Sequence, residues 1–131
     1  MEKIAAENPV QLLLIDDHEA LAHSLAAALR YSNYAVEVAL SYHQALEKIS
    51  RQPFDLILSD VDLGVHSGIE LIRDLPARTI SRPVPPLIFM TGNLSYLHRK
   101  ELSPYPVLAK PFSIRRLLEM LETHFLQPQG T

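Results

Sequence analysis

Short apolar runs alternate with amphipathic stretches along most of the chain. The apolar runs are three to six residues long and rich in Leu, Ile and Val, which favours buried parallel strands. The amphipathic stretches carry apolar residues three and four positions apart, which favours helices that pack one face on a sheet. The expected strands are residues 10–15, 35–40, 55–60, 87–91 and 107–109.

Helices are expected between these strands and after the last one. Ser41 and Ser113 each precede an amphipathic stretch and are expected to cap a helix. Residues 76–86 hold four prolines, which predicts neither helix nor central strand there. The expected helices are residues 18–31, 41–51, 68–75 and 95–102, with a last one that begins after Ser113.

This alternation predicts the α/β class, with a doubly wound, five-stranded parallel sheet that has helices on both faces. The strand order that suits five such units is 2-1-3-4-5, the flavodoxin-like (βα)5 arrangement. We expect a single domain over residues 1–131, with its core at about 10–126 and polar tails at 1–9 and 127–131. The residues expected to face the core from the first and last helices are Leu21, Leu25, Ala28, Leu29, Ile114, Leu117, Leu118, Leu121 and Phe125.

Most of the apolar runs end in a residue that can bind a metal or a phosphoryl group. Asp16 and Asp17 follow the first strand, Asp60 ends the third, Thr91 ends the fourth, and Lys110 follows the fifth. Ligands of open α/β sheets bind just outside the carboxyl ends of the strands. We therefore expect three carboxylates, one hydroxyl and one ammonium group to converge at one edge of the sheet.

Three clustered carboxylates repel one another and call for a cation. Oxygen ligands without sulfur favour a hard ion, and Mg²⁺ leaves room for waters and a phosphate oxygen. Asp60 stands alone at the end of the central strand, so it is the best candidate for a nucleophile that forms an acyl phosphate. Asp16 and Asp17 are expected to bind the metal. His18 has no second histidine at ligand spacing, and we expect it in the first turn of the helix.

Composition narrows the class of protein further. The chain has no cysteine, which excludes disulfides and thiolate metal sites, and no apolar stretch of about 20 residues that could span a bilayer. The N-terminus lacks the apolar segment of a signal peptide, so we expect a cytoplasmic protein without membrane contact. Residues 1–75 hold 12 acids and 5 bases, whereas residues 76–131 hold 3 acids and 7 bases. The positive half could face an acidic partner surface, but we favour ordinary solvated helix faces. The basic residues do not form the stripe that is typical of a nucleic-acid binder.

Five segments together resemble the receiver domain of two-component response regulators. The resemblance implies that Asp60 accepts a phosphoryl group from a phosphohistidine on a histidine kinase or a histidine phosphotransfer protein. It also implies an output domain or a downstream protein as a second partner, and it leaves a homodimer open. The segments span nearly the whole chain and are residues 13–18, 55–60, 67–71, 89–92 and 108–112.

The same resemblance implies roles for individual residues. Asp17 and Asp60 would hold Mg²⁺ directly, Asp16 would do so through water, and Asp62 would contribute its backbone carbonyl. Thr91 would bond a phosphoryl oxygen and move on activation. Lys110 would pair first with Asp60 and then with the phosphoryl group, and its peptide bond to Pro111 would be cis.

Two further residues are expected to control the lifetime of the acyl phosphate. Asp62 and Asn93 each lie two positions beyond a pocket residue, Asp60 and Thr91, and can reach the path of an attacking water. The chain also departs from the family pattern. Thr91 and Lys110 are only 19 positions apart, so the helix between them is expected to be trimmed.

An enzyme of another class has similar landmarks. Haloacid-dehalogenase-type phosphatases also place Asp-x-Asp, Thr and Lys after successive strands, which would make Asp60 the nucleophile and Asp62 the general acid and base. Such enzymes have their metal-binding acids after the Lys, whereas the acid pair here precedes Asp60. A nucleotide- or flavin-binding module would need a Gly-rich phosphate loop, which the chain lacks. We therefore favour a signalling domain that is not an enzyme acting on other substrates.

Overall fold

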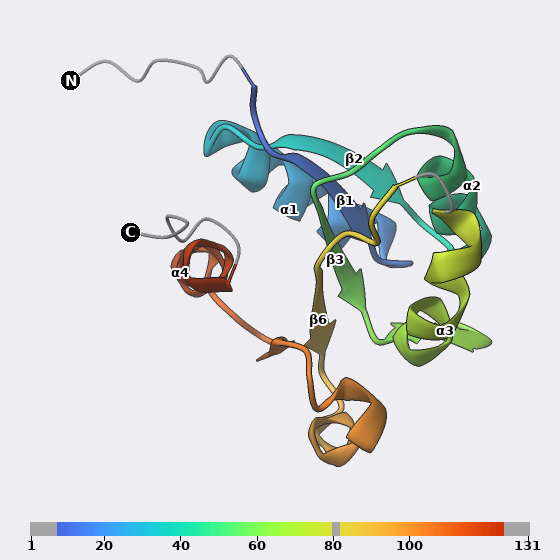
Figure 1. The fold of residues 1–131 in the computed structure, drawn as a ribbon. Coiled ribbons are helices and arrows are strands. Elements are labelled where there is room, and N and C mark those ends of the chain that lie inside the picture. The colour runs from blue at the N-terminus through green and yellow to red at the C-terminus, as the bar shows by residue number, and fades with distance from the viewer. Residues whose placement is uncertain (1–7, 80–81, 125–131) are drawn as a thin grey trace.

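The computed structural model of the chain describes residues 8–79 and 82–124, and its centre is a five-stranded parallel sheet (Figure 1). The spatial order is β2-β1-β3-β6-β7. This is the predicted 2-1-3-4-5 order once the strands of this sheet alone are counted, so the predicted fold is confirmed. The strands are β1 (Gln11–Ile15), β2 (Ala35–Ala39), β3 (Leu56–Asp60), β6 (Leu87–Thr91) and β7 (Val107–Ala109).

Helices cover both faces of the sheet, two on each. Side chains of a strand point alternately to the two faces, so Leu12 and Leu14 of β1 pack in one core and Leu13 and Ile15 in the other. The first core is closed by α1 and α4, and the second by α2 and α3. The helices are α1 (Glu19–Tyr31), α2 (Tyr42–Arg51), α3 (Gly68–Arg78) and α4 (Ile114–His124).

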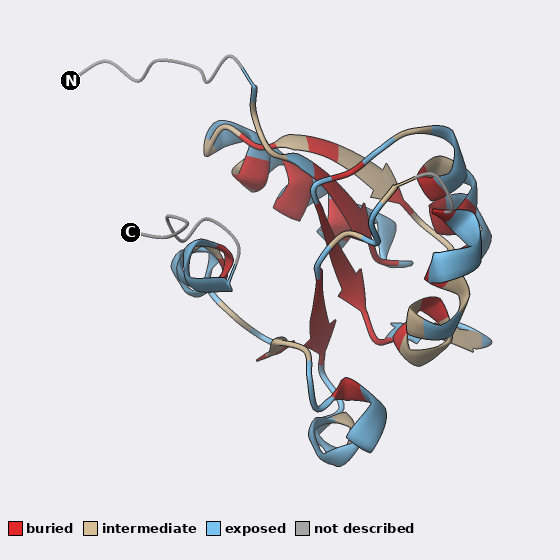
Figure 2. Cartoon of the chain, viewed as in Figure 1, coloured by how far each residue is buried: buried red, intermediate tan, exposed pale blue. Residues whose placement is uncertain are grey.

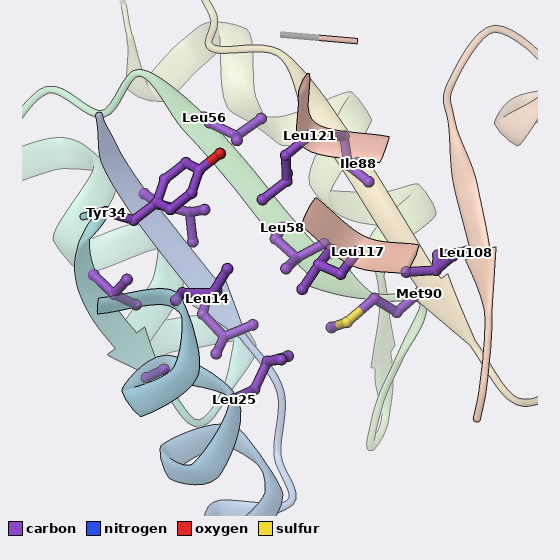
Figure 3. Packing of buried hydrophobic residues seen from close by; sticks show 14 of the residues in the cluster. Leu14, Leu25, Tyr34, Leu56, Leu58, Ile88, Met90, Leu108, Leu117 and Leu121 are labelled. Atoms are coloured by element: carbon purple, nitrogen blue, oxygen red, sulfur yellow. The ribbon is translucent and has the colours of Figure 1, made fainter. Parts of the chain in front are cut away.

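The three central strands are the most buried part of the molecule (Figure 2). Every residue of β3 and β6 is buried, which explains why these segments have continuous apolar sequences. On the α1/α4 face, Leu58 of β3 and Met90 of β6 meet Leu117 and Leu121 of α4 (Figure 3). The central strands are thus held firmly from both sides, and their carboxyl ends make a rigid platform for polar side chains.

The apolar stripes of the first and last helices were predicted only in part. Leu21 is 49% exposed and Ile114 is 36% exposed, because the sheet contacts α1 and α4 along stripes that lie one position further round each helix. Phe125 lies outside the described residues. The residues that α1 and α4 bury are Ala22, Leu25, Ala26, Leu29, Leu117, Met120 and Leu121.

Helix α3 extends through the proline at which it was predicted to stop. Pro76 lies inside the helix, which ends at Arg78 instead of residue 75. Proline removes the hydrogen bond that its amide would donate to the carbonyl four residues back, and the helix continues for only two residues beyond Pro76. The helix starts with a capping box, in which Ser67 accepts from the Glu70 amide and the Glu70 side chain accepts from the Ser67 amide.

The predicted helix at 95–102 is replaced by two short 3₁₀ turns, η1 (Leu94–His98) and η2 (Lys100–Leu102). Arg99 between them is extended, which interrupts any longer helix. Leu102 is buried and fixes η2 against the core of the α2/α3 face. The short spacing between Thr91 and Lys110 therefore does trim this element, as the sequence suggested.

The segment after Asp60, where no strand was predicted, forms a small antiparallel hairpin. Strand β4 (Asp62–Leu63) pairs with β5 (His66–Ser67). Gly64 has a φ of 74° in the turn between them, a conformation that glycine adopts without strain. The hairpin stands next to the end of β3 and gives the following residues a defined position.

Candidate functional site

The pairing register brings the predicted site residues together at one edge of the sheet. Ile15 lies opposite Ser59, so the next residues, Asp16 and Asp60, are neighbours on adjacent strands. Thr91 lies opposite Ala109, the residue before Lys110. The carboxyl ends of four strands thus bring acidic, hydroxyl and basic groups to one place, as the parallel order predicted.

Lys110 joins the two buried acids. Its Nζ lies 2.6 Å from Oδ2 of Asp60 and 3.3 Å from Oδ2 of Asp16. Asp16 is fully buried and Asp60 is 4% exposed. Burial alone would lower the pKa of Lys110, but its hydrogen bonds and charge interactions with Asp60 and Asp16 outweigh that effect and raise it. The ammonium group is therefore held in its charged form beside Asp60.

Both carboxylate oxygens of Asp60 have a partner. Lys110 contacts Oδ2, and the backbone amide of Asp62 donates to Oδ1 at 3.0 Å. Burial raises the pKa of Asp60, and these two hydrogen bonds oppose the rise. A carboxylate can act as a nucleophile toward phosphorus. The incoming phosphoryl group adds negative charge, and the fixed ammonium group of Lys110 is placed to balance it.

The Thr91 side chain forms two hydrogen bonds with the backbone of Asn93. The buried Thr91 hydroxyl accepts from the Asn93 amide at 2.9 Å and donates to the Asn93 carbonyl at 3.3 Å. The Asn93 side chain accepts from the amide and the hydroxyl of Ser95 at the start of η1. Thr91 is at the expected edge, but its hydroxyl here bonds to the following loop. The Lys110–Pro111 peptide bond is cis, as the resemblance implied.

Asp62 projects from the hairpin toward η1. Its carboxylate is exposed, and Oδ1 accepts a hydrogen bond from the Tyr96 hydroxyl at 2.9 Å. This bond links the segment after Asp60 to the segment after Thr91. This contact was not predicted, because the hairpin that directs Asp62 toward Tyr96 was not predicted.

Four residues at this edge could hold a metal ion. Asp16, Asp17, His18 and Asp60 each offer one ligand atom, and these atoms all lie within 4.8 Å of one another. Three of the four are acids that the sequence singled out. His18 was expected in the first turn of the helix, but it is the extended residue before α1, and its side chain does not cap the helix. Its position directly after the acid pair was the only sequence signal for its place in this group.

An apolar cavity of about 490 Å³ adjoins the site, between α1 and the start of α4. Asp16 and Lys110 line it at the site, and apolar residues line most of the remainder. Leu21 and Ile114, the two exposed members of the predicted core stripes, are both part of its wall. Their exposure therefore leaves an apolar surface beside the acidic edge.

Buried acids and a lysine at the carboxyl edge of a parallel sheet form a site that suits a cation and a phosphoryl group. The family model for the response regulator receiver domain matches residues 12–122. The chain belongs to this family. Among the described residues, none of the helices has the length and apolar character needed to cross a membrane.

Individual relatives agree with this assignment. The chain is 31% identical over 116 residues to the transcriptional regulatory protein ZraR of Salmonella typhimurium, covering 86% of this chain and 26% of ZraR. It is 29% identical over 115 residues to the aerobic respiration control sensor protein ArcB of Escherichia coli, covering 86% of this chain and 15% of ArcB. The chain thus spans only a minor part of these curated relatives.

Solved structures show the same fold. A CheY-like receiver domain protein from Methanospirillum hungatei superposes with a TM-score of 0.80 at 25% identity, covering 92% of this chain and 96% of the other. The receiver domain of the sensor histidine kinase PA1611 from Pseudomonas aeruginosa has a TM-score of 0.77 at 28% identity, covering 92% and 100%. That structure has a magnesium ion coordinated in its active site cleft. None of these similarities supports the haloacid-dehalogenase alternative.

Proposed function

We propose that residues 1–131 form one receiver domain of a two-component phosphorelay and that Asp60 is its phosphoacceptor. The observation that carries the proposal is the buried Asp60 carboxylate with Lys110 Nζ at 2.6 Å, next to Asp16 at the carboxyl edge of the sheet. An oxygen of Asp60 attacks the phosphorus of a phosphohistidine. A P–O bond forms, the P–N bond breaks, and the released imidazole takes up a proton.

The other residues stabilise the charge that this step brings in. Lys110 turns from Asp60 toward the phosphoryl oxygens, and Thr91 donates its hydroxyl to one of them after releasing the Asn93 carbonyl. Asp17 and Asp60 would hold Mg²⁺ directly, Asp16 through water, and Asp62 through its backbone carbonyl. The donor set, which includes three clustered carboxylates, fits a divalent cation. When bound, Mg²⁺ would neutralise part of the charge of the phosphoryl group.

Labelling and turnover measurements distinguish a signalling domain from a phosphatase. We expect acetyl phosphate with Mg²⁺ to label the chain once and the label to decay slowly, while a generic phosphate ester is not turned over. In that case the chain takes part only in its own phosphorylation and dephosphorylation and is not an enzyme for other substrates. Steady turnover of the ester would instead favour the phosphatase alternative.

A histidine kinase or a histidine phosphotransfer protein is the proposed donor, in the cytoplasm. We expect its phosphohistidine-bearing helix to pack in the apolar cavity, because the cavity opens on Asp16 and Lys110. The proposed receiver of the signal is an output domain or a downstream protein. Self-association stays open, and it has a parallel in the beryllofluoride-activated NtrC4 receiver domain, which is a dimer.

Leu21→Arg tests the docking surface. Because Leu21 lines the cavity and is half exposed, we expect a charged side chain there to slow transfer from the protein donor about tenfold and to leave labelling by acetyl phosphate unchanged. The measurement is the rate of transfer from a phosphorylated histidine protein. Val84→Arg is the control, since Val84 is comparably exposed, at 42% against 49%, but precedes β6 at the opposite edge of the sheet. Equal transfer rates in the Leu21 variant and the parent would contradict this surface.

Asp62 and Asn93 are proposed to set the lifetime of the acyl phosphate. Asp62 donates its amide to Asp60, and Asn93 donates its amide to Thr91, so both lie beside the residues that would hold the phosphoryl group. We expect Asp62→Asn and Asn93→Ala to change the decay rate several-fold, which corresponds to about 1 kcal/mol in the barrier. The measurement is the loss of label after the phosphodonor is removed. Asp55→Asn, at the amino end of β3, should decay at the parent rate, and parental decay in both test variants would refute the proposal.

A further inference from the structure

His18 lies beside Asp16 and Asp17 at the edge of the sheet, and the proposed function gives it no role. Its Nδ1 is 3.3 Å from Oδ1 of Asp16 and 3.3 Å from Oδ1 of Asp17. Its backbone amide also donates to Oδ1 of Asp16 at 3.0 Å, which fixes the orientation of that buried carboxylate. The imidazole therefore faces the same space that the carboxylates enclose.

The distances suit one cation. Two ligands on opposite sides of an ion with bonds of about 2.1 Å are about 4.2 Å apart. The four candidate ligand atoms lie within 4.8 Å of one another, so after a small rotation of the outer side chains His18, Asp17 and Asp60 can reach one ion directly, with Asp16 acting through water. Asp16 and Asp60 are buried and stay in place, whereas the His18 side chain is 72% exposed and can make this adjustment.

The geometry points to His18 as an additional ligand of the cation site, which makes the site bind a transition-metal dication such as Ni²⁺ more tightly than carboxylates alone would. Mg²⁺ prefers oxygen ligands and water, whereas imidazole nitrogen suits Ni²⁺, Co²⁺ and Zn²⁺. Removing the nitrogen should therefore affect the two kinds of ion differently. This inference rests on the cation site of the proposed function and adds to it the class of ion that the site accepts.

The test compares the binding of Ni²⁺ and Mg²⁺ by the full, untagged chain, measured by calorimetry. We expect His18→Gln to weaken Ni²⁺ binding about tenfold, equivalent to about 1.4 kcal/mol, and to change Mg²⁺ binding less than twofold. Because calorimetry measures binding alone, the result does not depend on phosphorylation. An unchanged affinity for Ni²⁺, or an equal loss of Ni²⁺ and Mg²⁺ binding, would overturn the role of His18.

Two further variants separate the possible outcomes. His43→Gln controls for a second nickel site, because the rings of His43 and His66 lie 5.2 Å apart on the α2/α3 face. If this variant and not His18→Gln loses Ni²⁺ affinity, the inference is wrong. Asp17→Asn should weaken the binding of both Ni²⁺ and Mg²⁺, since it removes a carboxylate that is a proposed ligand of either ion. If Asp17→Asn leaves both affinities unchanged, the cation site itself fails, whatever His18 does.

Discussion

Asp60→Asn is expected to abolish the phosphoryl adduct that acetyl phosphate and Mg²⁺ add to the parent chain. An amide oxygen is a poor nucleophile for phosphorus, and the substitution also removes the negative charge that holds Lys110 at 2.6 Å. The mass of the intact protein, measured after incubation with the phosphodonor, should show about one added phosphoryl group in the parent and none in the variant.

The variant should remain folded, so that the loss of label reports on chemistry. Lys110 keeps Asp16 as a partner, and one of the mutually repelling carboxylates becomes neutral. Asp55→Asn, which changes an acid at the amino end of the same strand, is the matched control and should label like the parent. A phosphoryl group on the Asp60→Asn chain would move the acceptor to another residue and refute the assignment.

Gly68→Ala is expected to destabilise the fold by about 2 kcal/mol, although alanine is the better helix former. A Cβ at Gly68 would lie 2.6 Å from Cε1 and 3.0 Å from Cδ1 of Phe89, and the Phe89 side chain is fully buried. The ring cannot move without disturbing the tight packing of the α2/α3 core. Thermal unfolding should show a fall in Tm of roughly 8 °C, at about 4 °C per kcal/mol for a domain of this size.

Two variants show whether the contact with Phe89 is the cause. Gly92→Ala places its Cβ 3.9 Å from Cβ of Lys110, an ordinary contact, and should leave Tm nearly unchanged. Phe89→Leu removes the ring edge, so adding Gly68→Ala to it should cost clearly less than Gly68→Ala costs in the parent. If the two costs are equal, or if Gly68→Ala is as stable as the parent, the steric explanation is wrong.

The fold and the meeting of the main site residues could be predicted because both depend on simple regularities. Buried parallel strands need continuous apolar residues, and all their carboxyl ends reach the same edge of the sheet. The acids at 16, 17 and 60 and the lysine at 110 stand at those ends in the sequence itself. The parallel register then places these groups side by side, as the pairing of β1 with β3 and of β6 with β7 shows.

The features that sequence reasoning missed depend on local geometry. Pro76 was taken to end α3, but the helix continues for two residues beyond it. Leu21 was assigned to the core because its spacing is helical, and the precise rotation of α1 against the sheet decides otherwise. His18 and Tyr96 reach the site through a turn and a 3₁₀ segment, whose backbone angles have no periodic signature.

The two edge strands of the sheet, β2 and β7, could in principle form backbone hydrogen bonds with the edge strand of another copy of the protein. An open edge strand invites pairing with another chain and can lead to aggregation. Arg30 of α1 donates a hydrogen bond from Nη2 to the carbonyl of Val36 in β2 at 2.7 Å. This bond occupies a carbonyl oxygen that an incoming strand would need. Strand β7 has only three residues and lies between Pro106 and Pro111, which have no amide hydrogen to offer. Growth of the sheet from one copy to the next is therefore disfavoured at both edges.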